Sequence, residues 1–217
     1  MTTKFTFLIA FSLFYLFANV SQAEQLPIAS FSDSSLEGWE EKSFSGTTSY
    51  QLVSLEGKTV LRAESDDSAS ILIKKISVNL KKFPFLNWRW RIENRLPPAD
   101  ETTKLGDDYA ARIYVVVDGG ILPWRTRSVN YVWANEASKD SVWQNAFTGK
   151  NAMMIALRDR QDSRSTWYSE KRDVYQDLKR QFGREFESID AIAIMTDTDN
   201  SHGQVKGYYG DIYFSSK

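Results

Sequence analysis

The sequence predicts a mostly β protein, a two-sheet jelly-roll-like β-sandwich with one amphipathic helix near residues 172–182. Roughly nine short segments alternate apolar and polar residues, as strands with one buried face do. Turn-forming residues separate these segments, and no strand–helix–strand rhythm runs along the chain. No internal repeat or Pro/Gly/Ser-rich linker divides residues 24–217, so we expect a single domain there.

Two segments show the strand period most clearly. In the first, Leu86, Trp88 and Trp90 fall on one face, and charged residues fall on the other. In the second, Ile113 and Val115 alternate with more polar positions, and an Asp-Gly-Gly turn follows. The expected strands occupy residues 48–55, 58–65, 68–78, 85–94, 109–117, 127–135, 151–158, 190–197 and 207–215.

One segment has helical spacing instead. Val174, Leu178 and Phe182 recur every four residues, which places them on one face of a helix. Asp173 can cap its start and Gly183 can end it. We expect this amphipathic helix to pack across an end or edge of the sheets rather than to carry chemistry.

The first residues are typical of a secretory signal peptide. Lys4 precedes an apolar run over residues 5–18, and the small residues Ser21 and Ala23 have the spacing of a cleavage site. We therefore expect residues 1–23 to be a signal peptide and the protein to be periplasmic or secreted. An uncleaved anchor is the alternative, but it needs roughly 20 apolar residues. No later segment is long enough, so no membrane span is expected after cleavage.

Composition excludes several classes of site. The chain has no cysteine, which excludes thiolate catalysis, thiolate zinc sites and iron–sulfur clusters. It has one histidine, so a multi-histidine metal centre within one chain is excluded as well. Lys and Arg number 27 against 28 Asp and Glu, a balance that predicts no nucleic-acid partner. The sequence does not determine the oligomeric state.

The segment 195–203, MTDTDNSHG, gathers oxygen ligands and the histidine. An EF-hand loop starting at Asp197 would need glycine at its sixth position, where His202 stands. We expect no cofactor, and we interpret this segment as a polar turn between two strands. The alternative is a looser structural calcium site formed by Asp197, Asp199 and Asn200. No nucleophile motif accompanies His202, so we expect it to be an exposed turn residue.

Arginines on polar strand faces are candidates for ligand binding. Arg112 shares its face with Tyr114, so we expect it to be partly covered and to need a carboxylate partner. Asp107, Asp108, Asp197 and Asp211 are the candidates for that partner, and either a structural ion pair or a ligand clamp would result. A tryptophan in a polar context could stack on a sugar ring. The expected ligand-binding residues are Arg89, Arg91, Asp107, Asp108, Arg112, Tyr114, Trp124 and Asp197.

The motifs WRWRIEN, GDDYAARIYVVV, RSVNYVW, IAIMTDTDN and YYGDIYF, in this order, resemble a bacterial family of exported proteins, domain-of-unknown-function family 3047. The resemblance implies export and one domain, and it carries no established activity. The segment from LEGWEEKSFSG to ASILIKK is similar to the start of galactose-binding-like jelly rolls. That likeness implies glycan binding, often with a structural calcium, although some jelly rolls are polysaccharide lyases.

Together these observations favour an exported, non-catalytic protein that recognises a carbohydrate or another cell-envelope ligand. Two alternatives belong to other classes. The first is an enzyme that cleaves polysaccharides, either by paired carboxylates or by elimination assisted by Tyr and Arg. The second is a structural or assembly protein of the envelope that docks a partner on one sheet.

Overall fold

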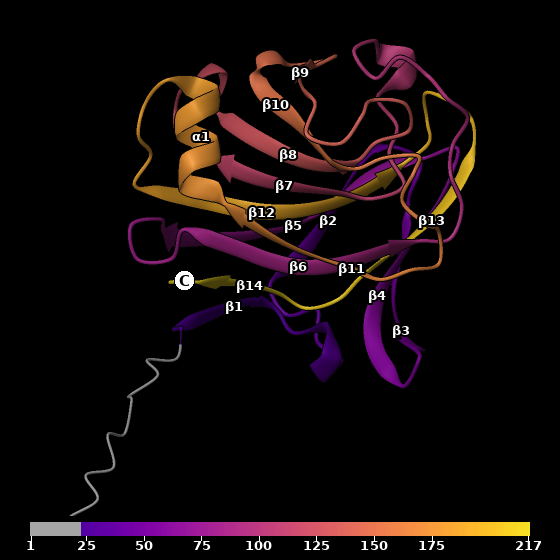
Figure 1. Ribbon diagram of the computed structural model, residues 1–217, viewed down its shortest axis with the longest axis horizontal. Helices are drawn as coiled ribbons and strands as arrows, with labels where there is room; N and C mark the ends of the chain where they lie inside the picture. The colour runs from indigo at the N-terminus through magenta and orange to yellow at the C-terminus, as the bar shows by residue number, and fades with distance from the viewer. Residues whose placement is uncertain (1–22) are drawn as a thin grey trace, which may run out of the picture.

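A computed structural model describes residues 23–217, and it is a sandwich of two seven-stranded sheets (Figure 1). Most of the predicted signal peptide, residues 1–22, lies outside the described residues. Sheet A contains β1 (Gln25–Ala29), β3 (Ser49–Leu55), β4 (Lys58–Asp66), β6 (Phe85–Ile92), β11 (Tyr168–Asp173), β13 (Gln204–Tyr209) and β14 (Ile212–Ser215). Sheet B contains β2 (Trp39–Ser45), β5 (Ala69–Asn79), β7 (Arg112–Val117), β8 (Arg127–Trp133), β9 (Val142–Asn145), β10 (Gly149–Arg158) and β12 (Ser188–Asp197).

The strand order explains how distant segments meet. Sheet B runs β2-β5-β12-β7-β8-β10-β9, with β8 and β10 parallel and its other pairs antiparallel. Sheet A runs β1-β14-β6-β13-β4-β3, and β11 pairs with the other edge of β6. Strands β13 and β14 lie end to end along β6 and are interrupted at Gly210 and Asp211. The two-sheet, jelly-roll-like sandwich with one helix that the sequence predicts is confirmed.

Aromatic rings join the two sheets in the core. Trp88 and Trp90 point inward from β6 and are almost completely buried. Trp88 stacks on Tyr131 of β8 with a centroid distance of 5.3 Å, and Trp90 lies 6.1 Å from Trp133. The predicted inward face of β6 is therefore correct, and it leaves the alternate residues of this strand on the outside of sheet A.

Helix α1 (Val174–Phe182) lies at one end of the sandwich beside sheet B (Figure 1). The side chain of Asp173 accepts a hydrogen bond from the Gln176 N–H, and Gly183 ends the helix with φ of 68°. Val174 and Leu178 are buried. The helix thus has the predicted caps and the predicted packing role. No helix among residues 23–217 is long and apolar enough to cross a membrane.

Candidate ligand-binding cleft on sheet B

A cleft of about 400 Å³ opens on the outer face of sheet B. Its lining comes from β2, β5, β12, β7, β8 and β10, and from the turns around residues 145–148 and 199–200. The lining combines apolar side chains, such as Ile71, Ala152 and Met195, with a few polar groups. Small-molecule sites in proteins have this composition.

Arg112 lies at the base of this cleft because of the period of β7. Ile113 and Val115 point into the core, so Arg112 and Tyr114 point outward. The rings of Tyr109 and Tyr114 lie 4.7 and 5.1 Å from the guanidinium carbon, close enough for cation–π attraction. Arg112 is only 1% exposed, so its charge depends on protein partners.

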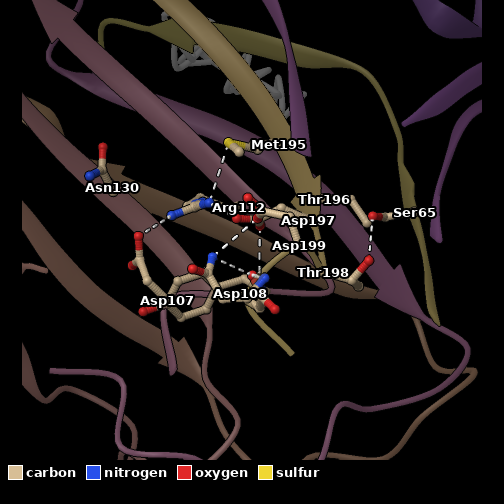
Figure 2. A network of polar contacts seen from close by, with 12 residues as sticks. Ser65, Asp107, Asp108, Arg112, Asn130, Met195, Thr196, Asp197, Thr198 and Asp199 are labelled. Carbon is tan, nitrogen blue, oxygen red and sulfur yellow. Dashed lines mark hydrogen bonds and ion pairs between the residues drawn. The ribbon is translucent and has the colours of Figure 1, made fainter. Parts of the chain in front are cut away.

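Two carboxylates supply that compensation (Figure 2). Arg112 Nη2 donates to Asp197 Oδ2, and Nη1 lies 3.6 Å from Asp107 Oδ2. Asp197 Oδ1 also accepts a hydrogen bond from the Tyr109 backbone N–H, at 3.2 Å. Asn145 Nδ2 donates to both oxygens of Asp107, at 3.0 and 3.1 Å. Arg112 and its two partners are therefore held rigidly before any ligand arrives.

Several buried polar atoms in the cleft have no hydrogen-bond partner among residues 23–217. They are the Nε and Nη1 donors of Arg112 and the Oδ1 acceptor of Asn130. Asn130 is fully buried, and its Nδ2 reaches only the sulfur of Met154, at 3.2 Å. An unmade hydrogen bond at a buried group costs about 1–3 kcal/mol. The cleft thus holds unused donors and an unused acceptor.

Burial also shifts the proton affinities of this network. Loss of hydration raises the pKa of Asp197 to about 8; the guanidinium of Arg112 opposes this rise, and the charges of Asp108 and Asp107 add to it. Burial raises the pKa of Asp107 as well, again against the effect of Arg112. Burial alone would lower the pKa of Arg112, but the charge of Asp197 and its other neighbours raises it well above its ordinary value. Arg112 therefore stays charged at every pH that the fold survives.

Two of the predicted ligand-binding arginines lie elsewhere. Arg89 and Arg91 project from the outer face of β6 in sheet A, not from sheet B. Arg91 is paired with Glu56 at 2.7 Å and with Glu93 at 2.6 Å. Arg89 and Arg91 therefore do not join Arg112 in one site, although all three are among the expected ligand-binding residues. Alternation fixes the side of a strand on which a residue lies, not the sheet to which the strand belongs.

Trp124, the tryptophan expected to stack on a sugar, also lies away from the cleft. Trp124 is 66% exposed, but it lies in the turn between β7 and β8, at the opposite end of β7 from Arg112, and it does not line the cleft. The exposed rings that line the cleft are Phe44, at 59%, and Phe147, at 54%. Sequence reasoning missed both. Their signal is a phenylalanine among polar neighbours, in KSFSG and NAFTG, where no apolar partner at alternate positions would bury it.

Comparisons with known proteins agree with this architecture. A family model described as "Protein of unknown function (DUF3047)" matches residues 37–213. The chain belongs to the DUF3047 family. No curated protein matches it.

Solved structures similar to this DUF3047 chain include a family 30 carbohydrate-binding module of a cellulosomal cellulase of Clostridium thermocellum. It is 11% identical, with a TM-score of 0.53 over 89% of this chain and 98% of that one. A second is the xyloglucanase domain of a type three effector from Sinorhizobium fredii in complex with cellobiose, at 12% identity, TM-score 0.47, and 83% and 95% coverage. A third is the Emp47p carbohydrate recognition domain, at 10% identity, TM-score 0.46, and 91% and 98% coverage. The first likeness shows a shared fold.

An acidic cluster of this DUF3047 chain lies beside the cleft. Carboxylate oxygens of Asp108, Asp197 and Asp199 lie within 4.8 Å of one another, the kind of donor that Ca²⁺ prefers. Asp108, however, already accepts hydrogen bonds from the Ser201 N–H, at 2.6 Å, and from the amide of Asn200. The three carboxylates could bind a cation, but Asn200 turns its NH₂ group instead of its oxygen toward them. Structural calcium therefore stays a prediction.

His202 lies in the turn between β12 and β13, where the chain crosses from sheet B to sheet A. Its φ is 51°, its side chain is 75% exposed, and Nδ1 lies 2.7 Å from Asp67 Oδ1. The hydrogen bond to Asp67 raises the pKa of His202. The expected exposed turn histidine is confirmed.

Proposed function

We propose that this protein is an exported, non-catalytic carbohydrate-binding protein whose ligand occupies the cleft of sheet B. One observation carries the proposal. Arg112 has donors and Asn130 has an acceptor without hydrogen-bond partners, and both residues line the same cleft. A sugar hydroxyl both donates and accepts, so adjacent hydroxyls satisfy both groups. A lone carboxylate ligand would satisfy only the arginine.

The rim of the cleft supports the same ligand class. Phe44 and Phe147 present exposed rings on which the C–H face of a sugar can stack. The family 30 carbohydrate-binding module, which shares this fold, supports carbohydrate as the ligand class. Export rests on the residues of the predicted signal peptide.

The acids of the cleft favour binding over hydrolysis. A glycoside hydrolase places two carboxyl groups about 5–10 Å apart on either side of the scissile bond, with access to water. Here Asp107 and Asp197 both lie against one guanidinium and are nearly inaccessible to water. We therefore assign these two carboxylates to holding Arg112. Release of a shortened or unsaturated sugar from a bound glycan would favour an enzyme instead.

The first test is substitution of Asn130 by Leu, which has nearly the same shape. Because it removes a buried acceptor without a partner, we expect the free energy of unfolding to stay the same or rise. We expect affinity for the best glycan on an array to fall at least about tenfold, since one buried hydrogen bond is lost. Calorimetric titration and urea denaturation measure the two quantities.

Phe147→Ala and Trp124→Ala provide a matched pair, since both remove an exposed ring. We expect Phe147→Ala to weaken glycan binding and Trp124→Ala to leave it unchanged. The reverse pattern would place the ligand away from the cleft. Release of shortened or unsaturated sugar from the bound glycan would show an enzyme, and no signal from any glycan would overturn the proposal.

A further inference from the structure

A second groove, of about 800 Å³, lies on the outer face of sheet A, on the opposite side of the molecule from the cleft. Its floor is formed by β6 and β11, which pair through Arg89 with Ser169 and Asn87 with Lys171. The turn between β3 and β4 forms one wall, and Figure 1 shows this hairpin extending past β6 on the side away from sheet B. Ser32 and Asp211 also line the groove.

The hairpin wall is fixed in place. Glu56, at the tip of the turn, has φ of 54°, and Gly57 follows with φ of 75°. One oxygen of Glu56 lies 2.7 Å from Arg91 Nη1, and the other accepts from Trp167 Nε1 at 3.2 Å. Because these contacts bind the turn to β6 and to the segment before β11, the groove exists without a ligand.

Three cations line the groove: Lys58, Arg89 and Lys171. None of them is in an ion pair among residues 23–217.

The two acids of the lining are already engaged. Glu170 Oε1 accepts from Trp90 Nε1 at 2.9 Å and from Arg158 Nε at 2.6 Å. Asp211 accepts from the backbone and the hydroxyl of Ser32, at 2.8 and 2.5 Å, and these neutral donors leave its charge in place. Because Glu170 is paired with Arg158, the three cations outnumber the one remaining carboxylate of the lining, and the groove is positive.

Arg89 is positioned rather than loose. Its guanidinium carbon lies 4.5 Å from the centroid of the Trp167 ring. Its aliphatic part crosses Gly210, where a Cβ atom would come within 2.5 Å of the Arg89 side chain. A held guanidinium presents a planar fork of N–H donors, which matches the two oxygens of a carboxylate or a phosphate.

We infer that this groove is a second binding site, for an anionic ligand that carries carboxylate or phosphate groups. Arg89 binds one anionic group through its fork of donors. Lys58 and Lys171, on the wall and the floor, attract further negative charge through their ammonium groups. The inference does not rest on the proposed function, because the two sites lie on different sheets and use different residues.

Calorimetric titrations of the chain from residue 24 with trigalacturonate and with tripolyphosphate test the inference, with maltotriose as the neutral ligand. We expect both anions to bind, more weakly as NaCl is added, and to compete with each other. Arg89→Gln should weaken binding at least about tenfold, the effect of one lost charge-assisted contact. Binding of one anion alone would support the site and identify the charged group that it prefers.

Two control variants separate a built site from general attraction. Lys42→Gln with Lys150→Gln removes the same charge as Lys58→Gln with Lys171→Gln, but from sheet B. We expect only the sheet A pair to weaken binding. Gly210→Ala keeps every charge, but its Cβ would push the Arg89 side chain out of its present position, so it should weaken binding too. Equal effects of both lysine pairs, no effect of Gly210→Ala in a folded protein, or no binding of either anion at low salt would overturn the inference.

Discussion

Replacing Arg112 by Met is expected to lower the free energy of unfolding by about 3–5 kcal/mol at pH 8.5. The substitution keeps an unbranched but shorter side chain and removes the cation that faces Asp197 and Asp107, both of which are nearly inaccessible to water. The remaining hydrogen bonds from the Tyr109 N–H and from Asn145 stabilise the carboxylates only in part. Urea denaturation followed by tryptophan fluorescence measures the loss.

The loss should shrink at pH 5, because carboxyl groups without a buried cation can take up protons and become neutral. Adding Asp197→Asn to Arg112→Met should restore part of the stability at pH 8.5, since it removes one of the two orphaned charges. Lys81→Met is the control, because it breaks an exposed pair with Glu187 that is worth less than about 1 kcal/mol. A loss in Arg112→Met no larger than in Lys81→Met would contradict the role of the buried pair.

The environment of Arg112 shows how far the sequence could lead. Alternation in residues 112–117 placed Arg112 and Tyr114 on one face, and the tyrosine indicated that this face is covered. The need for a carboxylate partner followed from burial. The choice among Asp107, Asp108, Asp197 and Asp211 did not follow, because it depends on the pairing of Arg112 with Met195 between β7 and β12. Asp211 lies in the segment between β13 and β14 of sheet A.

Two of the strands that the sequence did not predict have a different cause. Strand β2, WEEKSFS, and strand β11, YSEKRD, are polar on both faces, so they carry no alternation that sequence reasoning can detect. They are strands because β5 and β6 offer them unpaired backbone groups. Apolar–polar alternation in the sequence identified the core strands. It did not identify the polar strands β2 and β11, which contribute Phe44 to the cleft and Lys171 to the groove.

The wild-type protein should lose stability as pH rises from about 4 to about 8. The folded pKa of Asp197, about 8, lies above its unfolded value of about 3.9, so the folded state holds a proton that the unfolded chain releases. This contribution is fully present below pH 4 and is gone above pH 8. Burial raises the pKa of Asp107 and of Glu101 in the same direction. Urea denaturation at half-unit steps of pH should show a decline on the order of a few kcal/mol.

Asp197→Asn should flatten that decline, because an amide cannot release the proton and still accepts the Tyr109 N–H bond. His202 requires its own control, since its raised pKa also gives stability that is lost as pH rises through neutrality. His202→Asn removes that titration at a position where asparagine tolerates the positive φ. If the decline persists in Asp197→Asn and vanishes in His202→Asn, the exposed turn governs the pH response. If it vanishes in Asp197→Asn alone, the proton belongs to the carboxyl that holds Arg112 in the cleft.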